Sequence, residues 1–164
     1  MNPFPSRSLH RLSAALGWLG LGDPDSASEE LTAMDPEDKR HPWALEAGCR
    51  VAAAREAWQD LIELAEGNLR ATPDRPAGWM YRARALQGLR KTQEAVDGLR
   101  PVALRFDADP EPADQMAELL EELGLSGQAA EWRSEATCRR LTAAAAEVIA
   151  KAKAEQSVGF IEEP

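Results

Sequence analysis

Apolar and polar residues are distributed along this chain with the spacing of amphipathic helices. Apolar positions recur at steps of three or four residues, most clearly in segments 45–52 and 58–69, which is the spacing of one buried helix face. Proline or glycine separates successive apolar segments, for example at 22–24, 73–76 and 124–127. No segment alternates apolar and polar residues over enough positions to predict a strand. The pattern therefore predicts an all-helical fold.

The predicted helices repeat with a fixed step of 34 residues. Small residues keep this step at Ala15, Cys49, Ala83 and Ala117, and prolines keep it at Pro42, Pro76 and Pro110. A period in this range indicates helix pairs that bury their apolar faces by stacking on copies of themselves. We therefore predict an array over residues 8–136, made of these repeats: 8–41, 42–75, 76–109 and 110–136.

The two ends of the chain depart from this repeat. We assign residues 1–7 to an N-terminal segment and 157–164 to a loose tail. The last helix begins near Gln128 and meets no glycine or proline before Gly159, so it extends past its repeat over residues 137–156. We interpret this extension as a cap for the open end of the array, because its alanine-rich stripe is thin for a coiled coil. Pairing with another chain is the alternative.

Two local features predict where individual helices begin and end. Ser26 and Glu29 have the spacing of a capping box, which predicts that Ser26 caps the second helix of the first repeat. Pro101 falls inside the second helix of the third repeat, where it removes a backbone hydrogen bond and clashes with the preceding turn. We expect a kink or an early stop there, eased by Gly98.

Charge and hydropathy argue against several classes of partner. The 164 residues include 28 Asp and Glu against 19 Lys and Arg, for a formal net charge of -9, which disfavours nucleic acid. No apolar run approaches the roughly 20 residues of a membrane span. Leucines at helical spacing near the N-terminus do not form the compact apolar block of a signal peptide. We therefore predict a cytoplasmic protein with neither a nucleic-acid nor a membrane partner.

No combination of residues predicts catalysis, a metal site or a cofactor. Cys49 and Cys138 lack the spacing of a zinc site or a disulfide framework. Cys49 occupies the small position of its repeat and is interpreted as a packing residue, and Cys138 is expected to be half-buried. His10 and His41 lie in different repeats, and each is interpreted as a helix cap or a surface residue. The chain is predicted not to be an enzyme.

The step of 34 residues, with its bulky and small positions, resembles the tetratricopeptide repeat family. The third repeat is most similar to the family pattern, through Trp79, Ala83, Leu86, Ala95 and Leu99. The resemblance covers about residues 8–136, and the chain looks like the bacterial members of the family. It implies a right-handed superhelix of about four helix-turn-helix repeats, a long C-terminal capping helix, and a surface that binds other proteins.

Family geometry implies a concave groove lined by the first helix of each repeat. The implied partner-binding residues are Leu9, Leu12, Leu16, Leu19, Trp43, Glu46, Arg50, Met80, Arg84 and Gln87. Acidic residues of the fourth repeat continue this face at Glu111, Asp114, Glu118 and Glu121. The predicted face therefore changes from apolar through basic to acidic along the array.

Arg50 and Arg84 occupy the same position in neighbouring repeats, on helices that pack about 8–10 Å apart. Two guanidinium groups at that separation can hold one carboxylate of an acidic partner with bidentate hydrogen bonds. In the alternative interpretation each arginine pairs with a local acid, for instance Glu46 or Glu118. Some members of the family hold a C-terminal carboxylate with lysine and asparagine on this face, and the corresponding positions here are apolar.

Three functions follow from this pattern. The first is an adaptor that binds a peptide or helix of another protein in the groove. The second is a homodimer or assembly protein that uses the long last helix and the four N-terminal leucines, since Ala15 and Trp18 are expected to supply the inner face of that first helix. The third, RNA binding, is disfavoured by the acidic residues of the fourth repeat.

Overall fold

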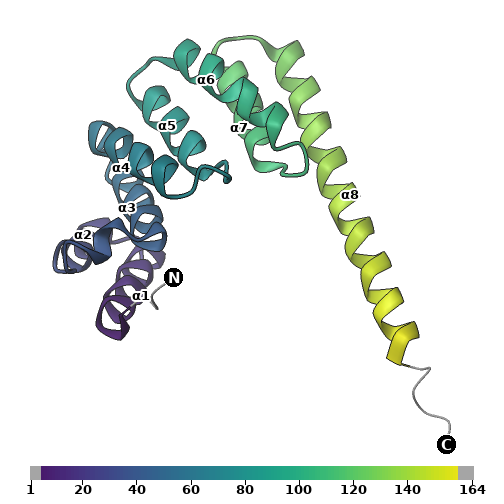
Figure 1. The fold of residues 1–164 in the computed structure, drawn as a ribbon. Helices are drawn as coiled ribbons and strands as arrows, with labels where there is room; N and C mark the ends of the chain where they lie inside the picture. The colour runs from purple at the N-terminus through teal and green to yellow at the C-terminus, as the bar shows by residue number, and fades with distance from the viewer. Residues whose placement is uncertain (1–4, 159–164) are drawn as a thin grey trace, which may run out of the picture. The chain divides into compact units, whose positions relative to one another are not determined.

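The computed structural model describes residues 5–158, and the regular elements of this range are helices. Residues 1–4 of the N-terminal segment and residues 159–164 of the predicted tail lie outside the described range. The elements are α1 (Ser6–Gly20), α2 (Pro24–Thr32), the short 3-10 helix η1 (Asp38–Arg40), α3 (Pro42–Ala54), α4 (Trp58–Ala71), α5 (Ala77–Gly88), α6 (Thr92–Arg105), α7 (Glu111–Glu122) and α8 (Ser126–Val158) (Figure 1). The all-helical prediction is confirmed.

The helices follow the 34-residue step closely. The first helices of three successive pairs begin at Pro42, Ala77 and Glu111. Pro42 is the first residue of α3, and Pro76 and Pro110 directly precede α5 and α7. Proline suits this place because its fixed φ favours the helix and its missing N–H would be unbonded there in any case.

The chain forms two compact units, Met1–Val102 and Ala103–Pro164, which we call unit 1 and unit 2 and describe separately. In unit 1, α1 packs on α2, α3 packs on α4, and α4 packs on α5. The small residues at the 34-residue step are buried there, with Ala15 and Cys49 fully enclosed. The prediction that Cys49 is a packing residue is confirmed, and burial raises the pKa of its thiol to about 12.

Helices α4 and α5 approach each other closely at Gly78 and Gly88. A Cβ atom added to Gly88 would lie 2.3 Å from Cδ2 of Trp58, and one added to Gly78 would lie 2.8 Å from Cγ of Leu69. Both distances are shorter than van der Waals contact, so a side chain at either glycine forces its neighbour to move. Glycine therefore allows the two helices to pack at this separation.

The start of α2 differs from the predicted capping box. Asp23 is the N-cap, and its Oδ1 accepts a hydrogen bond from the backbone N–H of Ser26 at 3.0 Å. The Ser26 hydroxyl also donates to Oδ2 of Asp23 at 2.7 Å, and these bonds lower the pKa of the Asp23 carboxyl. The physical reason is Pro24, which takes the first helical position and so makes the preceding residue the cap. Ser26 caps nothing itself.

Helix α6 continues through Pro101 to Arg105, so the early stop expected at this proline is absent. Leu99 and Val102, on either side of Pro101, are both buried. Their burial offsets the cost of about 3 kcal/mol that a proline imposes inside a helix.

Unit 2 contains α7 packed against the first part of α8. Its core includes Met116, Leu119 and Leu120 of α7 together with Ala129 and Ala136 of α8. From residue 140 to 154 every side chain of α8 is exposed, and Figure 1 shows this half of α8 extending past α7. Within unit 2 the second half of α8 therefore covers no other helix, and its role as a cap of the array stays a prediction. Cys138, expected to be half-buried, is exposed.

A candidate binding groove on unit 1

A hollow of about 350 Å³ lies against α1 and α3 in unit 1. Half of the predicted groove residues line it: Leu12, Leu16, Trp43, Glu46 and Arg50. Ala47 and Arg75 complete the lining. The hollow thus has an apolar wall of leucine and tryptophan and a polar side of charged residues.

The buried face of α1 is rotated relative to the prediction. Its buried residues are Ser8, Leu12 and Ala15, and Leu19 packs against the cluster formed by Ala15 with two residues of α2 and α3. At 3.6 residues per turn these four positions fall within about 60° of one another on the helix. Trp18 lies about 60° outside Ala15 on the same count and is 39% exposed.

The four leucines of α1 therefore do not share one outward face. Leu12 and Leu19 belong mainly to the core, Leu16 is half-buried beside the hollow, and Leu9 is 48% exposed outside it. The prediction that Trp18 supplies the inner face was thus wrong, and Leu19 packs towards the core and does not line this hollow.

Trp43 is the aromatic residue that lines the hollow. It stands in the first turn of α3, and its side chain is 53% exposed. The residue before Pro42, His41, caps this helix by accepting a hydrogen bond at Nδ1 from the Trp43 N–H at 3.3 Å, and the two rings meet edge to face at 5.1 Å. The prediction that His41 is a cap or surface residue is confirmed. The cap and the ring contact together help to hold the Trp43 side chain in place at the start of α3.

Glu46 forms an ion pair with Arg75 rather than with Arg50. Nη1 of Arg75 lies 3.7 Å from Oε2 of Glu46. Arg75 stands in the turn between α4 and α5. The sequence analysis did not identify it, because the implied groove contained residues of the first helices alone and nothing in the spacing marks a residue in a linking turn.

Arg50 and Arg84 are both exposed, and the positive charges of both affect the pKa of the Tyr81 hydroxyl. Burial raises the pKa of Tyr81 to about 12, and the negative charge of Glu46 contributes further, whereas the charges of Arg50 and Arg84 lower it. The two guanidinium groups are therefore within electrostatic reach of one side chain. Among the residues described in unit 1, neither arginine forms an ion pair with a carboxylate.

Tyr81 is the residue near both arginines that the sequence analysis did not identify. It is half-buried on α5 and packs against the core cluster around Cys49. A signal was present, because Tyr81 stands 34 residues after Ala47, which lines the hollow. Met80 and Gln87, which were predicted, are half-buried on the same helix but are not among the residues that line this hollow.

The predicted acidic continuation of the face belongs to unit 2. There, Asp114 pairs with Arg140 at 2.5 Å, and Glu121 pairs with Arg133. The Arg133 hydrogen bond lowers the pKa of the Glu121 carboxyl. Two of the four acidic residues predicted on this face are therefore paired with arginines of α8, so the negative charge of the face is partly neutralised.

Metal sites and membrane spans are both absent from the part of the chain that the structure describes. Between residues 5 and 158, no group of three or more histidine, cysteine, aspartate and glutamate side chains is arranged to hold a metal ion. Over the same range, no helix combines the length and the apolar character needed to cross a bilayer.

No family model matches the sequence, and no curated protein matches it. The structure is similar to a crystal structure of MamA, with a TM-score of 0.68 and 13% sequence identity over 85% of this chain and 82% of that chain. It is also similar to a structure of MamA MSR-1 C2, with a TM-score of 0.62 and 14% identity over 81% of this chain and 76% of that chain. MamA is a helical-repeat protein of the tetratricopeptide type. The 34-residue step, the helix pairs and this likeness together show that the chain has a tetratricopeptide-like helical-repeat fold.

Proposed function

We propose that this protein is a non-enzymatic adaptor that holds an acidic peptide segment of a partner protein in the hollow of unit 1. The observation that carries the proposal is the position of Arg50 and Arg84, which both act on Tyr81 while neither is paired with a carboxylate in unit 1. The local charge is therefore positive, although the whole chain carries a formal charge of -9.

The two sides of the hollow suggest how a peptide would bind. An apolar side chain of the peptide packs against Leu16 and Trp43, and a carboxylate about three residues further along reaches the arginines. Helices one repeat apart are about 10 Å apart, and three residues of extended chain span about 10 Å. Charge-assisted hydrogen bonds to arginine and a partly exposed tryptophan are the kinds of contact that dominate peptide interfaces.

A labelled peptide pair tests this proposal directly. One octapeptide carries Leu and Phe followed by two glutamates, and its matched partner carries two lysines in place of the glutamates. We expect the acidic peptide to bind at micromolar concentration and to change the fluorescence of Trp43, and we expect the basic peptide to bind at least tenfold more weakly.

The double variant Arg50→Glu with Arg84→Glu assigns the binding to these residues. It should weaken the binding of the acidic peptide by at least tenfold while leaving the helical content of the protein unchanged. Arg70→Glu with Arg100→Glu is the matched control, because both residues are exposed on helices of unit 1 and the change in charge is the same. Equal binding by the two double variants would show that the predicted arginines do not hold the peptide.

A second candidate function is homo-oligomeric assembly through α8. The observation that favours it is the exposure of Leu141, Val148 and Ile149 along the second half of this helix. The N-terminal leucines support it less than expected, because Leu12 is buried within unit 1. Light scattering over a concentration series tests it: a mass fixed at 17.9 kDa would exclude assembly.

A variant pair separates a specific α8 contact from a general effect of charge. Leu141→Glu with Val148→Glu places two acids on the apolar stripe, and Ala143→Glu with Ala150→Glu places them on the opposite side of the same exposed helix. If α8 pairs with a second copy through the stripe, the first variant is monomeric and the second still associates.

A further inference from the structure

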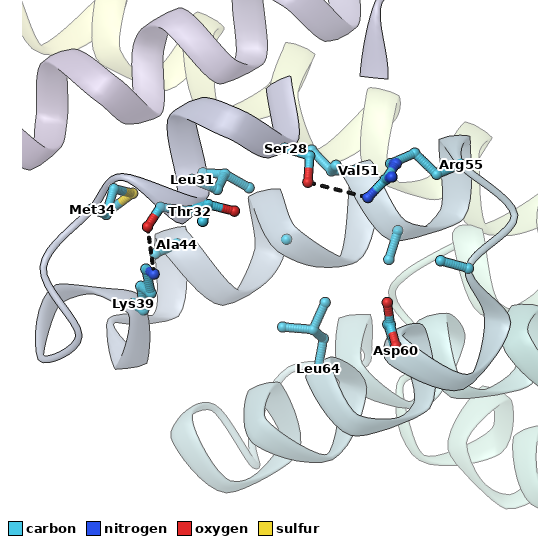
Figure 2. A pocket seen from close by; sticks show the side chains of 13 residues that line it. Ser28, Leu31, Thr32, Met34, Lys39, Ala44, Val51, Arg55, Asp60 and Leu64 are labelled. Atoms are coloured by element: carbon cyan, nitrogen blue, oxygen red, sulfur yellow. Dashed lines mark hydrogen bonds between the residues drawn. The ribbon is translucent and has the colours of Figure 1, made fainter. Parts of the chain in front are cut away.

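A second hollow in unit 1, separate from the groove, has a volume of about 220 Å³. It lies between α2 and α4, and α3 forms its floor (Figure 2). The floor consists of small residues, Ala44, Gly48 and Ala52, and the walls include Leu31 of α2 and Leu64 of α4. The lining is therefore mainly apolar, with charged side chains only towards the ends.

The 34-residue step explains why this hollow is empty of side chains. Gly48 corresponds in register to Arg82 of α5 and to Met116 of α7, so two later repeats have a long side chain where the second repeat has none. Arg82 extends across α6, since a Cβ atom placed on Gly98 would lie 3.5 Å from its Nη1. Gly98 in turn corresponds to Leu64. Leu64 packs over the glycine, since a Cβ atom placed on Gly48 would lie 3.3 Å from its Cδ2, and the hollow remains beside the Leu64 side chain.

The register also defines which shape the hollow accepts. The later repeats fill the corresponding position with the unbranched chains of arginine and methionine, which are long and narrow. From the level of Ala44 to that of Ala52 the floor extends over eight residues of helix, about 12 Å. An extended unbranched chain of about eight carbons is somewhat shorter than this floor and fits along it.

The two ends of the hollow differ in charge. At one end, Nζ of Lys39 donates to the carbonyl oxygen of Thr32 at 2.7 Å, and an ammonium group has two further hydrogens to donate. At the other end, Arg55 already bonds Asp25 at 2.8 Å, and Asp60 also lines that end. An anionic head group is therefore favoured beside Lys39 and disfavoured beside Asp60.

We infer that this hollow binds a small amphiphile with an unbranched alkyl chain and a carboxylate head. The chain lies along α3 beside Leu64, which packs against Gly48, and the carboxylate accepts a hydrogen bond from Lys39. The site uses none of the residues proposed to bind a peptide, so it adds a small-molecule ligand to the proposed adaptor function.

Octanoate is the probe that tests the site, and octylamine is its matched probe of opposite charge. In titrations of the full chain followed by methyl NMR, octanoate should shift the signals of Met34, Leu31 and Leu64, and octylamine should bind at least fivefold more weakly. Cyclohexanecarboxylate, which has the same head group on a wider body, should also bind at least fivefold more weakly than octanoate.

Two variants connect the binding to this hollow. Gly48→Met supplies internally the side chain that the next repeats possess, and it should abolish the octanoate shifts. Gly17→Met is the matched control, because a side chain at Gly17 meets nothing within 4 Å. If Gly48→Met disturbs the fold, Lys39→Gln is the decisive variant instead, and it should weaken the binding of octanoate at least fivefold. Equal binding of octanoate and octylamine, or octanoate shifts that persist in these variants, would overturn the proposal.

Discussion

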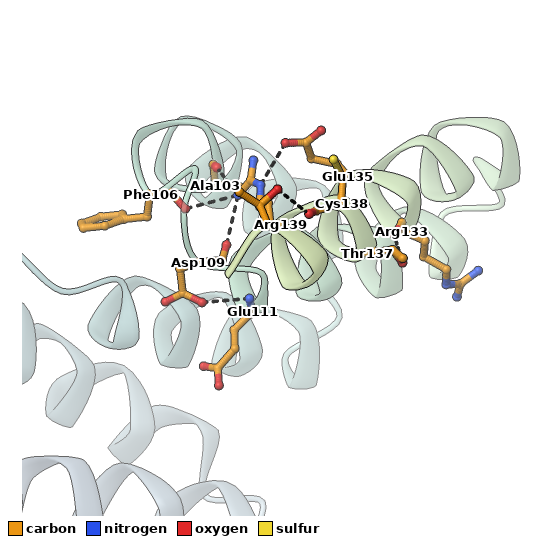
Figure 3. Close-up of polar contacts among 10 residues, drawn as sticks. Ala103, Phe106, Asp109, Glu111, Arg133, Glu135, Thr137, Cys138 and Arg139 are labelled. Atoms are coloured by element: carbon orange, nitrogen blue, oxygen red, sulfur yellow. Dashed lines mark hydrogen bonds and ion pairs between the residues drawn. The ribbon is translucent and has the colours of Figure 1, made fainter. Parts of the chain in front are cut away.

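Arg139 of α8 donates a hydrogen bond from Nη1 to the main-chain carbonyl oxygen of Ala103, at 3.0 Å and across 36 residues of sequence. The same nitrogen lies 3.2 Å from the carbonyl oxygen of Phe106 and 3.1 Å from that of Asp109. Nε of this side chain pairs with Glu135 at 3.0 Å. Figure 3 shows the guanidinium pointing into the loop between α6 and α7 (Figure 3). One buried side chain therefore holds the end of α6 and the following loop against α8.

Arg139→Ala should lower the free energy of unfolding of unit 2 by about 2–4 kcal/mol, because it removes the side-chain donor from the buried carbonyl of Ala103 and from the partly buried carbonyls of Phe106 and Asp109. Arg139→Lys should recover little of this loss, since an ammonium group lacks the planar fork of donors. Hydrogen exchange of the amides of unit 2 measures the effect. Arg140→Ala is the control: its exposed pair with Asp114 is worth at most about 1 kcal/mol. Equal losses in both variants would contradict the role given to Arg139.

Gly88→Ala should destabilise unit 1 by about 1–3 kcal/mol, because the new methyl group would overlap the indole of Trp58 and separate α4 from α5. Thermal unfolding followed by circular dichroism and by Trp58 fluorescence measures it. Gly17→Ala has open space around the added methyl group and should instead stabilise α1 by about 0.5–1 kcal/mol. An unchanged melting temperature in Gly88→Ala would mean that the helices are not in this close contact.

The two thiols should react at very different rates with a disulfide reagent at pH 8. Cys138 is exposed and should react within minutes, whereas Cys49 is buried and has a pKa of about 12, so it carries almost no thiolate. In Cys138→Ser the remaining thiol should become reactive only in denaturant. Rapid modification of Cys49 in that variant under native conditions would show that the core around α3 opens readily.

Unit 1 should lose stability as the pH rises from 10 towards 12. Tyr81 keeps its proton more tightly when folded, because burial raises its pKa from 10.0 to about 12. Its contribution is therefore fully present below pH 10 and is lost as the pH rises through the folded pKa. Tyr81→Phe should show a smaller decrease in the free energy of unfolding over this range. An identical alkaline decrease in both proteins would assign the loss to other groups.

The helix pairs could be predicted from the sequence because their signals are local and repeated. Proline and small residues at a step of 34 indicate where each pair starts and which positions are buried, and Cys49 could be placed in this way. The start of α2 was misassigned because two overlapping caps, at Asp23 and at Ser26, compete within four residues, and Pro24 decides between them. The choice between two such caps depends on the backbone conformation at the start of the helix, which the spacing of the residues does not show.

The sites were harder to predict because they depend on contacts between repeats. The face of α1 was misjudged because a helix with apolar residues on several sides has no single direction of burial in its sequence. Arg75 reaches the groove from a turn, and no periodicity marks it. In contrast, Tyr81 and the hollow over Gly48 both become visible when the repeats are aligned position by position, which requires asking where each repeat differs from its neighbours.

Helix α6 is continuous through Pro101, but it lacks one backbone hydrogen bond there. Because a proline has no N–H, the carbonyl of Asp97 receives no hydrogen bond from the residue four positions later. This missing bond lies directly before the boundary between Val102 and Ala103. The turn of α6 that lacks this bond thus lies beside the residue at which the chain passes from one unit to the other, so local opening there breaks one backbone hydrogen bond fewer than in an ordinary helical turn.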